Sequence, residues 1–94
     1  MKIPIKKIEL KENINAFMRR AGYVPFYESY VRQLASGGYP RFHIYIDDLE
    51  EKFVLNLHLD QKRPSYGKET AHSGDYEGGP VEKEADRIVD FLYE

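Results

Sequence analysis

The chain has 94 residues, of which 41% are hydrophobic and 32% charged, and it contains no cysteine. This length suits one domain, residues 1–94, with a single core, and the composition is typical of a folded globular protein. The lack of cysteine excludes disulfides, thiolate zinc sites and cysteine nucleophiles. No segment has the ~18 apolar residues of a membrane span or the apolar core of a secretion signal, so we expect a soluble, cytoplasmic protein.

The net charge of -2 conceals two unequal halves of the chain. Residues 1–46 hold eight bases and three acids (+5), whereas residues 47–94 hold six bases and thirteen acids (-7). This asymmetry predicts a basic face for an anionic partner, or faces that complement each other within or between protomers. If folding places the bases of one half beside the acids of the other, the asymmetry has no functional meaning.

Two elements are predicted in the first quarter of the chain. Residues 3–8 alternate only in part, and Pro4 is tolerated at the start of an edge strand, so a short edge strand is expected there. A helix is predicted over about 12–21, followed by Gly22 as its C-cap. The apolar residues that define one face of this helix, at i, i+3, i+4 and i+7, are Ile14, Phe17, Met18 and Ala21.

A second helix is predicted over about 26–35. Its apolar positions repeat the same spacing, Pro25 suits its first turn, and the pair Gly37–Gly38 ends it. These apolar positions are Tyr27, Tyr30, Val31 and Leu34.

A β-hairpin and a terminal helix complete the predicted fold. Residues 41–47 and 53–60 alternate strictly between apolar and polar, which predicts two antiparallel strands, and residues 80–93 carry an apolar stripe at helical spacing. We therefore expect an α+β domain: a small antiparallel sheet built on the central hairpin, with three helices (about 12–21, 26–35 and 80–93) packed on one face.

The polar face of the hairpin follows from the two-residue period of strands. Arg41, His43 and Tyr45 share this face on the first strand, and Asn56, His58 and Asp60 share it on the second. A four-residue turn at 48–51 would place His43 opposite Asn56, whereas a shift of two residues would place His43 opposite His58.

The leading functional hypothesis is a non-catalytic binding module. Residues 61–79 are predicted to form a polar, aromatic loop; loops of this length are uncommon in compact domains and are usually binding loops, lids or disordered segments. The hairpin's polar face and this loop together make the predicted binding surface. Its residues are Arg41, His43, His58, Asp60, Lys62, Arg63, Tyr66, Lys68, His72 and Tyr76.

The alternative hypothesis is a metal-assisted hydrolase, for example of phosphoesters. Imidazole and carboxylate groups bind divalent metal ions, and a catalytic site keeps one position open for water. The predicted ligands are His58, Asp60, His72 and Asp75, with Arg41 or Lys62 stabilising developing negative charge. These residues follow no established metal-binding spacing.

A third hypothesis has two forms. In a winged-helix arrangement, the helix at 26–35 would read nucleic acid, although Arg32 is the only base on its exposed side and phosphate contacts normally need several. The eight tyrosines instead favour a protein partner or a homodimer, because tyrosine suits protein interfaces.

Overall fold

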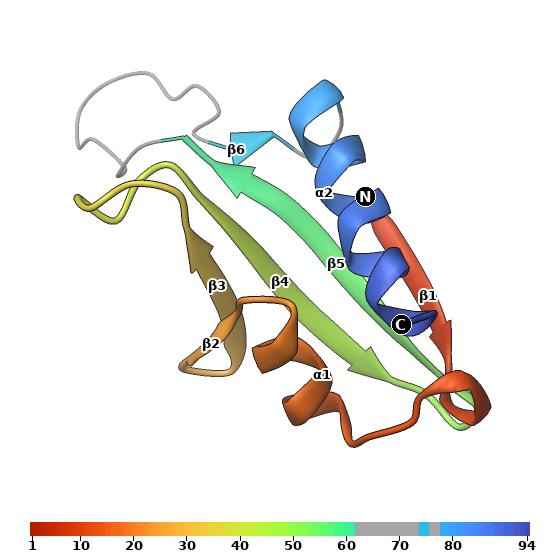
Figure 1. The fold of residues 1–94 in the computed structure, drawn as a ribbon. Helices are drawn as coiled ribbons and strands as arrows, with labels where there is room; N and C mark the ends of the chain where they lie inside the picture. Colours follow the sequence, from red (N-terminus) through yellow and green to blue (C-terminus); the bar gives the residue numbers. More distant parts are fainter. Residues whose placement is uncertain (62–73, 76–77) are drawn as a thin grey trace.

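A computed structural model describes residues 1–61, 74–75 and 78–94 (Figure 1). The elements in chain order are β1 (Lys2–Lys6), the short 3-10 helix η1 (Lys7–Glu9), α1 (Ile14–Arg20), β2 (Val24–Phe26), β3 (Ser29–Gln33), β4 (Arg41–Asp48), β5 (Lys52–Asp60), β6 (Gly74–Asp75) and α2 (Gly79–Leu92). The α+β class is confirmed, but the described residues contain two α-helices and not the three predicted.

The strands form one antiparallel sheet in the order β1-β5-β4-β3-β2, and the two-residue strand β6 pairs with the end of β5. The long β4–β5 hairpin lies at its centre, and β1 pairs with β5 from residue 2 to residue 6. The sheet is therefore larger than the small hairpin-based sheet that the sequence predicted.

The predicted helix at 26–35 is wrong. Its residues form the second half of the β2–β3 hairpin, which turns at Tyr27, where φ is +55°. In β3, Ser29 and Val31 point to one face of the sheet and Tyr30 points to the other. The helix-like spacing of the apolar residues therefore comes from a strand with apolar side chains on both faces. Pairing with the free edge of β4 satisfies backbone groups that a helix would have left exposed there.

The register of the central hairpin is the shifted one. Leu49 N donates to Lys52 O at 2.9 Å, which closes a tighter turn than residues 48–51 would give. His43 consequently lies opposite His58, and Arg41 lies opposite Asp60. The apolar residues of the two strands still share one face of the sheet, because a two-residue shift of register keeps side chains on the same side.

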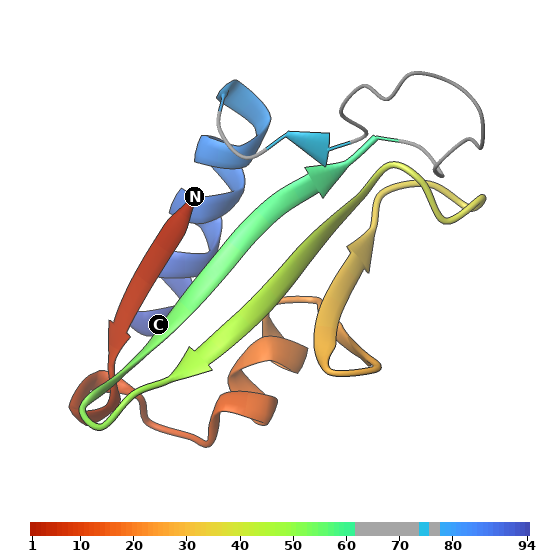
Figure 2. The ribbon, with the colours of Figure 1, turned by 180° about the vertical axis from the view of Figure 1, so that it is seen from behind.

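Both helices cover the same face of the sheet (Figure 1), and the opposite face is seen in Figure 2. Helix α1 begins after Asn13, whose Oδ1 accepts a 2.8 Å hydrogen bond from Ala16 N. The core between helices and sheet consists of Ile3, Ile5, Phe17, Met18, Ala21, Tyr23, Phe42, Ile44, Leu55, Leu57, Leu59, Val81, Ala85, Ile88 and Leu92.

One buried carboxylate interrupts this apolar core. Glu84 of α2 is 4% exposed and accepts hydrogen bonds from Tyr23 Oη at 2.7 Å and from Arg87 Nε at 2.9 Å. Arg32 Nη1 lies 3.3 Å from the same carboxylate. The charge is therefore paired and hydrogen-bonded, as a buried ion has to be.

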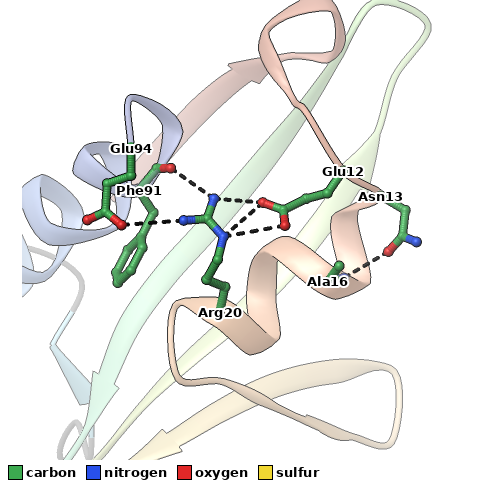
Figure 3. A network of polar contacts seen from close by, with 6 residues as sticks. All are labelled: Glu12, Asn13, Ala16, Arg20, Phe91 and Glu94. Atoms are coloured by element: carbon green, nitrogen blue, oxygen red, sulfur yellow. Dashed lines mark hydrogen bonds and ion pairs between the residues drawn. The ribbon is translucent and has the colours of Figure 1, made fainter.

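Arg20 joins the two helices at their C-terminal ends (Figure 3). Its guanidinium donates to Glu12 Oε2 at 2.6 Å and to the carbonyl oxygen of Phe91 at 2.9 Å, and it lies over the ring of Phe91. A second ion pair, 3.6 Å long, connects it with Glu94. These contacts hold α1 beside the end of α2, on the face away from the hairpin's polar residues.

Within the described parts of the chain, neither helix has the length and apolar character needed to cross a membrane.

Candidate functional site

The face of the sheet that carries no described helix is called the open face here. It consists of alternate strand residues: Lys2, Pro4 and Lys6 of β1; Lys52, Val54, Asn56, His58 and Asp60 of β5; Arg41, His43, Tyr45 and Asp47 of β4; Ser29, Val31 and Gln33 of β3; and Val24 and Phe26 of β2. Four bases and two acids give this set a formal charge of +2, although the whole chain carries -2. The open face is thus the basic side of an acidic protein.

Asp60 is the centre of a polar cluster on the open face. Its Oδ2 lies 3.1 Å from Arg41 Nε and 3.2 Å from His43 Nδ1, and its Oδ1 lies 3.0 Å from His58 Nε2. The four side chains are only 9% to 17% exposed. The direct cross-strand pairing of β4 and β5 brings them together, because opposed residues on one face have neighbouring Cβ atoms.

Ser29 extends this cluster onto β3. Its Oγ lies 2.7 Å from His43 Nε2 and also donates to the carbonyl oxygen of Phe26 at 2.9 Å. Serine, histidine and aspartate therefore follow one another as in hydrolytic triads. Ser29 is only 5% exposed, however, and its hydroxyl holds the β2–β3 turn, so it is not presented to a substrate.

The single hydroxyl proton of Ser29 permits two arrangements of His43. When the proton points to His43, Nε2 accepts it and Nδ1–H donates to Asp60. When the proton points to Phe26, Nε2–H donates to Ser29 and the Nδ1 lone pair faces the Asp60 carboxylate. Burial lowers the pKa of His43 below its ordinary value of 6.5; Asp60 opposes this shift, and His58 and Arg41 add to it.

Three rings form a platform on the open face, defined by His43, Tyr45 and His58. The centroids of His43 and Tyr45 are 4.6 Å apart with planes 28° from parallel, and those of Tyr45 and His58 are 6.0 Å apart at 15°. Tyr45 is 48% exposed, whereas the two histidines beneath it are largely covered. A flat ligand can therefore stack on Tyr45, whose orientation is fixed by its neighbours.

A hollow of ≈ 380 Å³ lies beside Tyr45. Its lining residues are Met1, Lys2, Tyr45, Asn56, Leu57 and His58. Lys2 Nζ donates to Asn56 Oδ1 at 2.9 Å, and Asn56 Nδ2 donates to the carbonyl oxygen of Tyr45 at 3.2 Å. The hollow thus combines one aromatic wall with an ammonium group, an amide and an imidazole, and its volume is in the range of small-ligand sites.

Of the predicted binding residues, the structure brings together Arg41, His43, His58 and Asp60. The others lie outside the described residues: Lys62, Arg63, Tyr66, Lys68, His72 and Tyr76. Of the predicted metal ligands, His58 and Asp60 are adjacent and His72 lies outside the described residues. Asp75 is described only through its backbone pairing with Leu59.

Sequence reasoning misses four residues of the site: Lys2, Ser29, Tyr45 and Asn56, the last of which is predicted on the correct face but not in the binding surface. Ser29 falls within the predicted helix that does not exist, and Lys2 lies in an edge strand whose partner the sequence does not identify. Tyr45 is predicted on the correct face but not in the site, although an aromatic residue between polar neighbours on an exposed strand face is the available signal. The winged-helix hypothesis fails, because its DNA-reading helix is strand β3.

Comparisons with protein-family models, with curated proteins and with solved structures give no match.

Proposed function

We propose that the protein is a non-catalytic binding module that holds single-stranded nucleic acid on the open face of its sheet. The proposal rests on the position of Tyr45: its ring is half exposed, stacks with two histidines and lies beside the hollow of ≈ 380 Å³. Bases of single strands stack on exposed aromatic rings, and an antiparallel sheet with one free face is a common support for such rings.

The polar groups around Tyr45 support a nucleotide as the occupant of the hollow. Asn56 Oδ1 accepts one hydrogen bond, from Lys2, and its second lone pair can accept another from a base edge, while the ammonium group of Lys2 suits a phosphate. Lys2 has three N–H donors and uses one on Asn56, so donors remain for an anion.

The basic residues of the open face continue beyond this hollow. Lys6 lies four residues from Lys2 on β1, about 13 Å away at the rise of a strand. It is the direct cross-strand partner of Lys52, and neither lysine has an acidic partner among the described residues. Directly opposed like charges destabilise a sheet, and a bound phosphate would relieve this repulsion.

A larger hollow of ≈ 730 Å³ adjoins these two lysines. Its lining residues are Lys6, Lys7, Ile8, Leu49, Glu51 and Lys52. The two hollows, each lined by at least one lysine, lie near opposite ends of β1 and define a path for an extended chain across β1 and β5. The lack of cysteine favours the reducing cytoplasm as the location of the protein, and single-stranded nucleic acid occurs in that compartment.

The test is fluorescence anisotropy with labelled ten-nucleotide single strands of RNA and DNA, with a duplex of the same sequence for comparison. We expect binding of the single strands, weak binding of the duplex, and a loss of about 5- to 150-fold in affinity for Tyr45→Ala, the equivalent of about 1–3 kcal/mol for one stacked base. The control is Tyr93→Ala, at an exposed tyrosine at the end of α2, which should change affinity less than twofold.

Because Tyr45 packs on His43, the thermal unfolding midpoint of Tyr45→Ala has to be measured in parallel, and binding compared well below it. No binding of single strands at millimolar concentration would reject the proposal. So would equal affinities of the wild type and a folded Tyr45→Ala variant. A protein partner or a homodimer remains a prediction that sedimentation analysis can test.

A further inference from the structure

We propose that His43, His58 and Asp60 form a binding site for one divalent transition-metal ion of the zinc class. One ligand atom from each residue lies within 4.8 Å of the other two. The proposal does not rest on nucleic-acid binding, although His43 and His58 also belong to the platform around Tyr45. Its ligand set has His43 in place of the predicted His72 and Asp75.

The distances suit a single ion. A tetrahedral ion with ligands at about 2.1 Å holds its ligand atoms about 3.4 Å apart. Asp60 Oδ2 lies 3.2 Å from His43 Nδ1 and Asp60 Oδ1 lies 3.0 Å from His58 Nε2, so each imidazole is already close to this separation from one oxygen of the carboxylate. The ligand atoms that lie furthest apart are within 4.8 Å of each other, so their separation has to shorten by at most about 1.4 Å, which rotations of the imidazoles and the carboxylate can provide.

The hydrogen bonds of Ser29 give an independent reason for a cation. When the Ser29 hydroxyl donates to Phe26, His43 Nε2–H donates to Ser29, and the lone pair of His43 Nδ1 is directed at the carboxylate of Asp60. Two lone pairs then face each other at 3.2 Å. An ion between the imidazole and the carboxylate satisfies every group in this chain of contacts at once. Metal-bound histidines are usually oriented in this way, by a hydrogen bond from the second ring nitrogen.

Arg41 fixes the carboxylate in the same way. Its Nε holds Oδ2 of Asp60, so that Oδ1 faces His58, and its guanidinium lies 4.6 Å from the ring centroid of Tyr39 and 4.8 Å from that of Phe26. The positive charge of Arg41 lowers the affinity for a cation, but ligating carboxylates are commonly hydrogen-bonded like this. Two imidazoles and one carboxylate favour zinc, copper, nickel or cobalt over magnesium or calcium.

The test uses the full chain after dialysis against a chelator and needs no nucleic acid. Zinc is titrated against a chromophoric competitor, cobalt is followed by its visible absorption, and ring nitrogen shifts of the three histidines are recorded by NMR. We expect one zinc per chain, shifts at His43 Nδ1 and His58 Nε2, and at least a tenfold loss of zinc affinity in His58→Gln and Asp60→Asn. Magnesium should not compete.

The matched control is His72→Gln, which removes the third histidine of the chain and should leave zinc affinity within twofold. Because His43 is buried, His43→Gln serves only if its circular dichroism matches that of the wild type. Zinc binding that is absent at 0.1 mM, or that survives unchanged in both His58→Gln and Asp60→Asn, would overturn the proposal. A loss confined to His72→Gln would overturn this ligand set as well.

Discussion

The phenol of Tyr23 donates a 2.7 Å hydrogen bond to Glu84, a residue 61 positions further along the chain. Tyr23 is 1% and Glu84 4% exposed, so this bond lies inside the core and joins the segment after α1 to helix α2. The same carboxylate is bound by Arg87 and by Arg32. The interior of the domain therefore depends on one charged residue whose partners come from three parts of the chain.

We expect Glu84→Ala to lower the free energy of unfolding by about 3 kcal/mol, at the low end of the range for a broken buried ion pair. Its partners Arg87 and Arg32 are about one-third exposed, which moderates the cost. Urea denaturation measures the change. The control is Asp86→Ala, which removes the same charge from an exposed position of α2 and should change stability by less than about 0.5 kcal/mol. Equal effects of the two substitutions would contradict the role assigned to Glu84.

Stability should fall at alkaline pH because of Tyr23. Burial, followed by the negative charge of Glu84 and the hydrogen bond to it, raises the pKa of Tyr23 well above its ordinary value of 10.0. The unfolded chain releases this proton near pH 10 and the folded chain keeps it, so the stabilisation is complete below pH 10 and declines as pH rises above it, by up to about 1.4 kcal/mol per pH unit.

The variant that isolates this contribution is Tyr23→Phe. It removes the hydrogen bond to Glu84 and should be less stable than the wild type at pH 8, yet its stability should decline less steeply between pH 10 and 11. Urea denaturation at several pH values measures both effects. Parallel stability curves for the two proteins above pH 10 would show that Tyr23 does not retain its proton in the folded state.

Lys52→Glu should raise the stability of the fold and weaken the binding of single-stranded nucleic acid. It replaces the opposed pair Lys6–Lys52 with an ion pair, so we expect the free energy of unfolding to rise by about 0.2–1 kcal/mol. Affinity for single strands should fall, and the salt dependence of binding should flatten by about 0.7 in log–log slope for each phosphate that the variant no longer neutralises. Lys83→Glu makes the same change of net charge on α2 and should leave both the affinity and the salt slope nearly unaltered. A fall in stability for Lys52→Glu would contradict the arrangement of these lysines.

In the central hairpin, side-chain alternation is enough to predict which residues share a face but not which residues lie opposite each other. Arg41, His43, His58 and Asp60 are predicted to lie on one face because residues two apart on a strand point the same way, and they do share that face. The pairing of His43 with His58 is one of two registers that the sequence permits. The turn decides between them, since the hydrogen bond from Leu49 N to Lys52 O excludes the longer loop.

The segment 26–35 shows where a pattern fails. An i, i+3, i+4, i+7 spacing of apolar residues describes a helix, but it also describes a strand whose two faces are both partly covered. Val31 is buried on the open face and Tyr30 packs against α1 on the other, through a hydrogen bond to Asn15. A local pattern cannot distinguish these cases, because the partner that covers each face comes from elsewhere in the chain.

Periodicity over neighbouring residues is enough to predict the α+β class, helices near 12–21 and 80–93, the central hairpin and the face on which its polar residues lie. The strand order, the conversion of 26–35 into β2 and β3, the contact of His43 with Ser29 and Asp60, and the neighbourhood of Lys2 and Tyr45 emerge only in the folded molecule. All of these depend on backbone pairing between strands, and such pairing is set by which edges and apolar faces remain to be covered once the whole chain has folded.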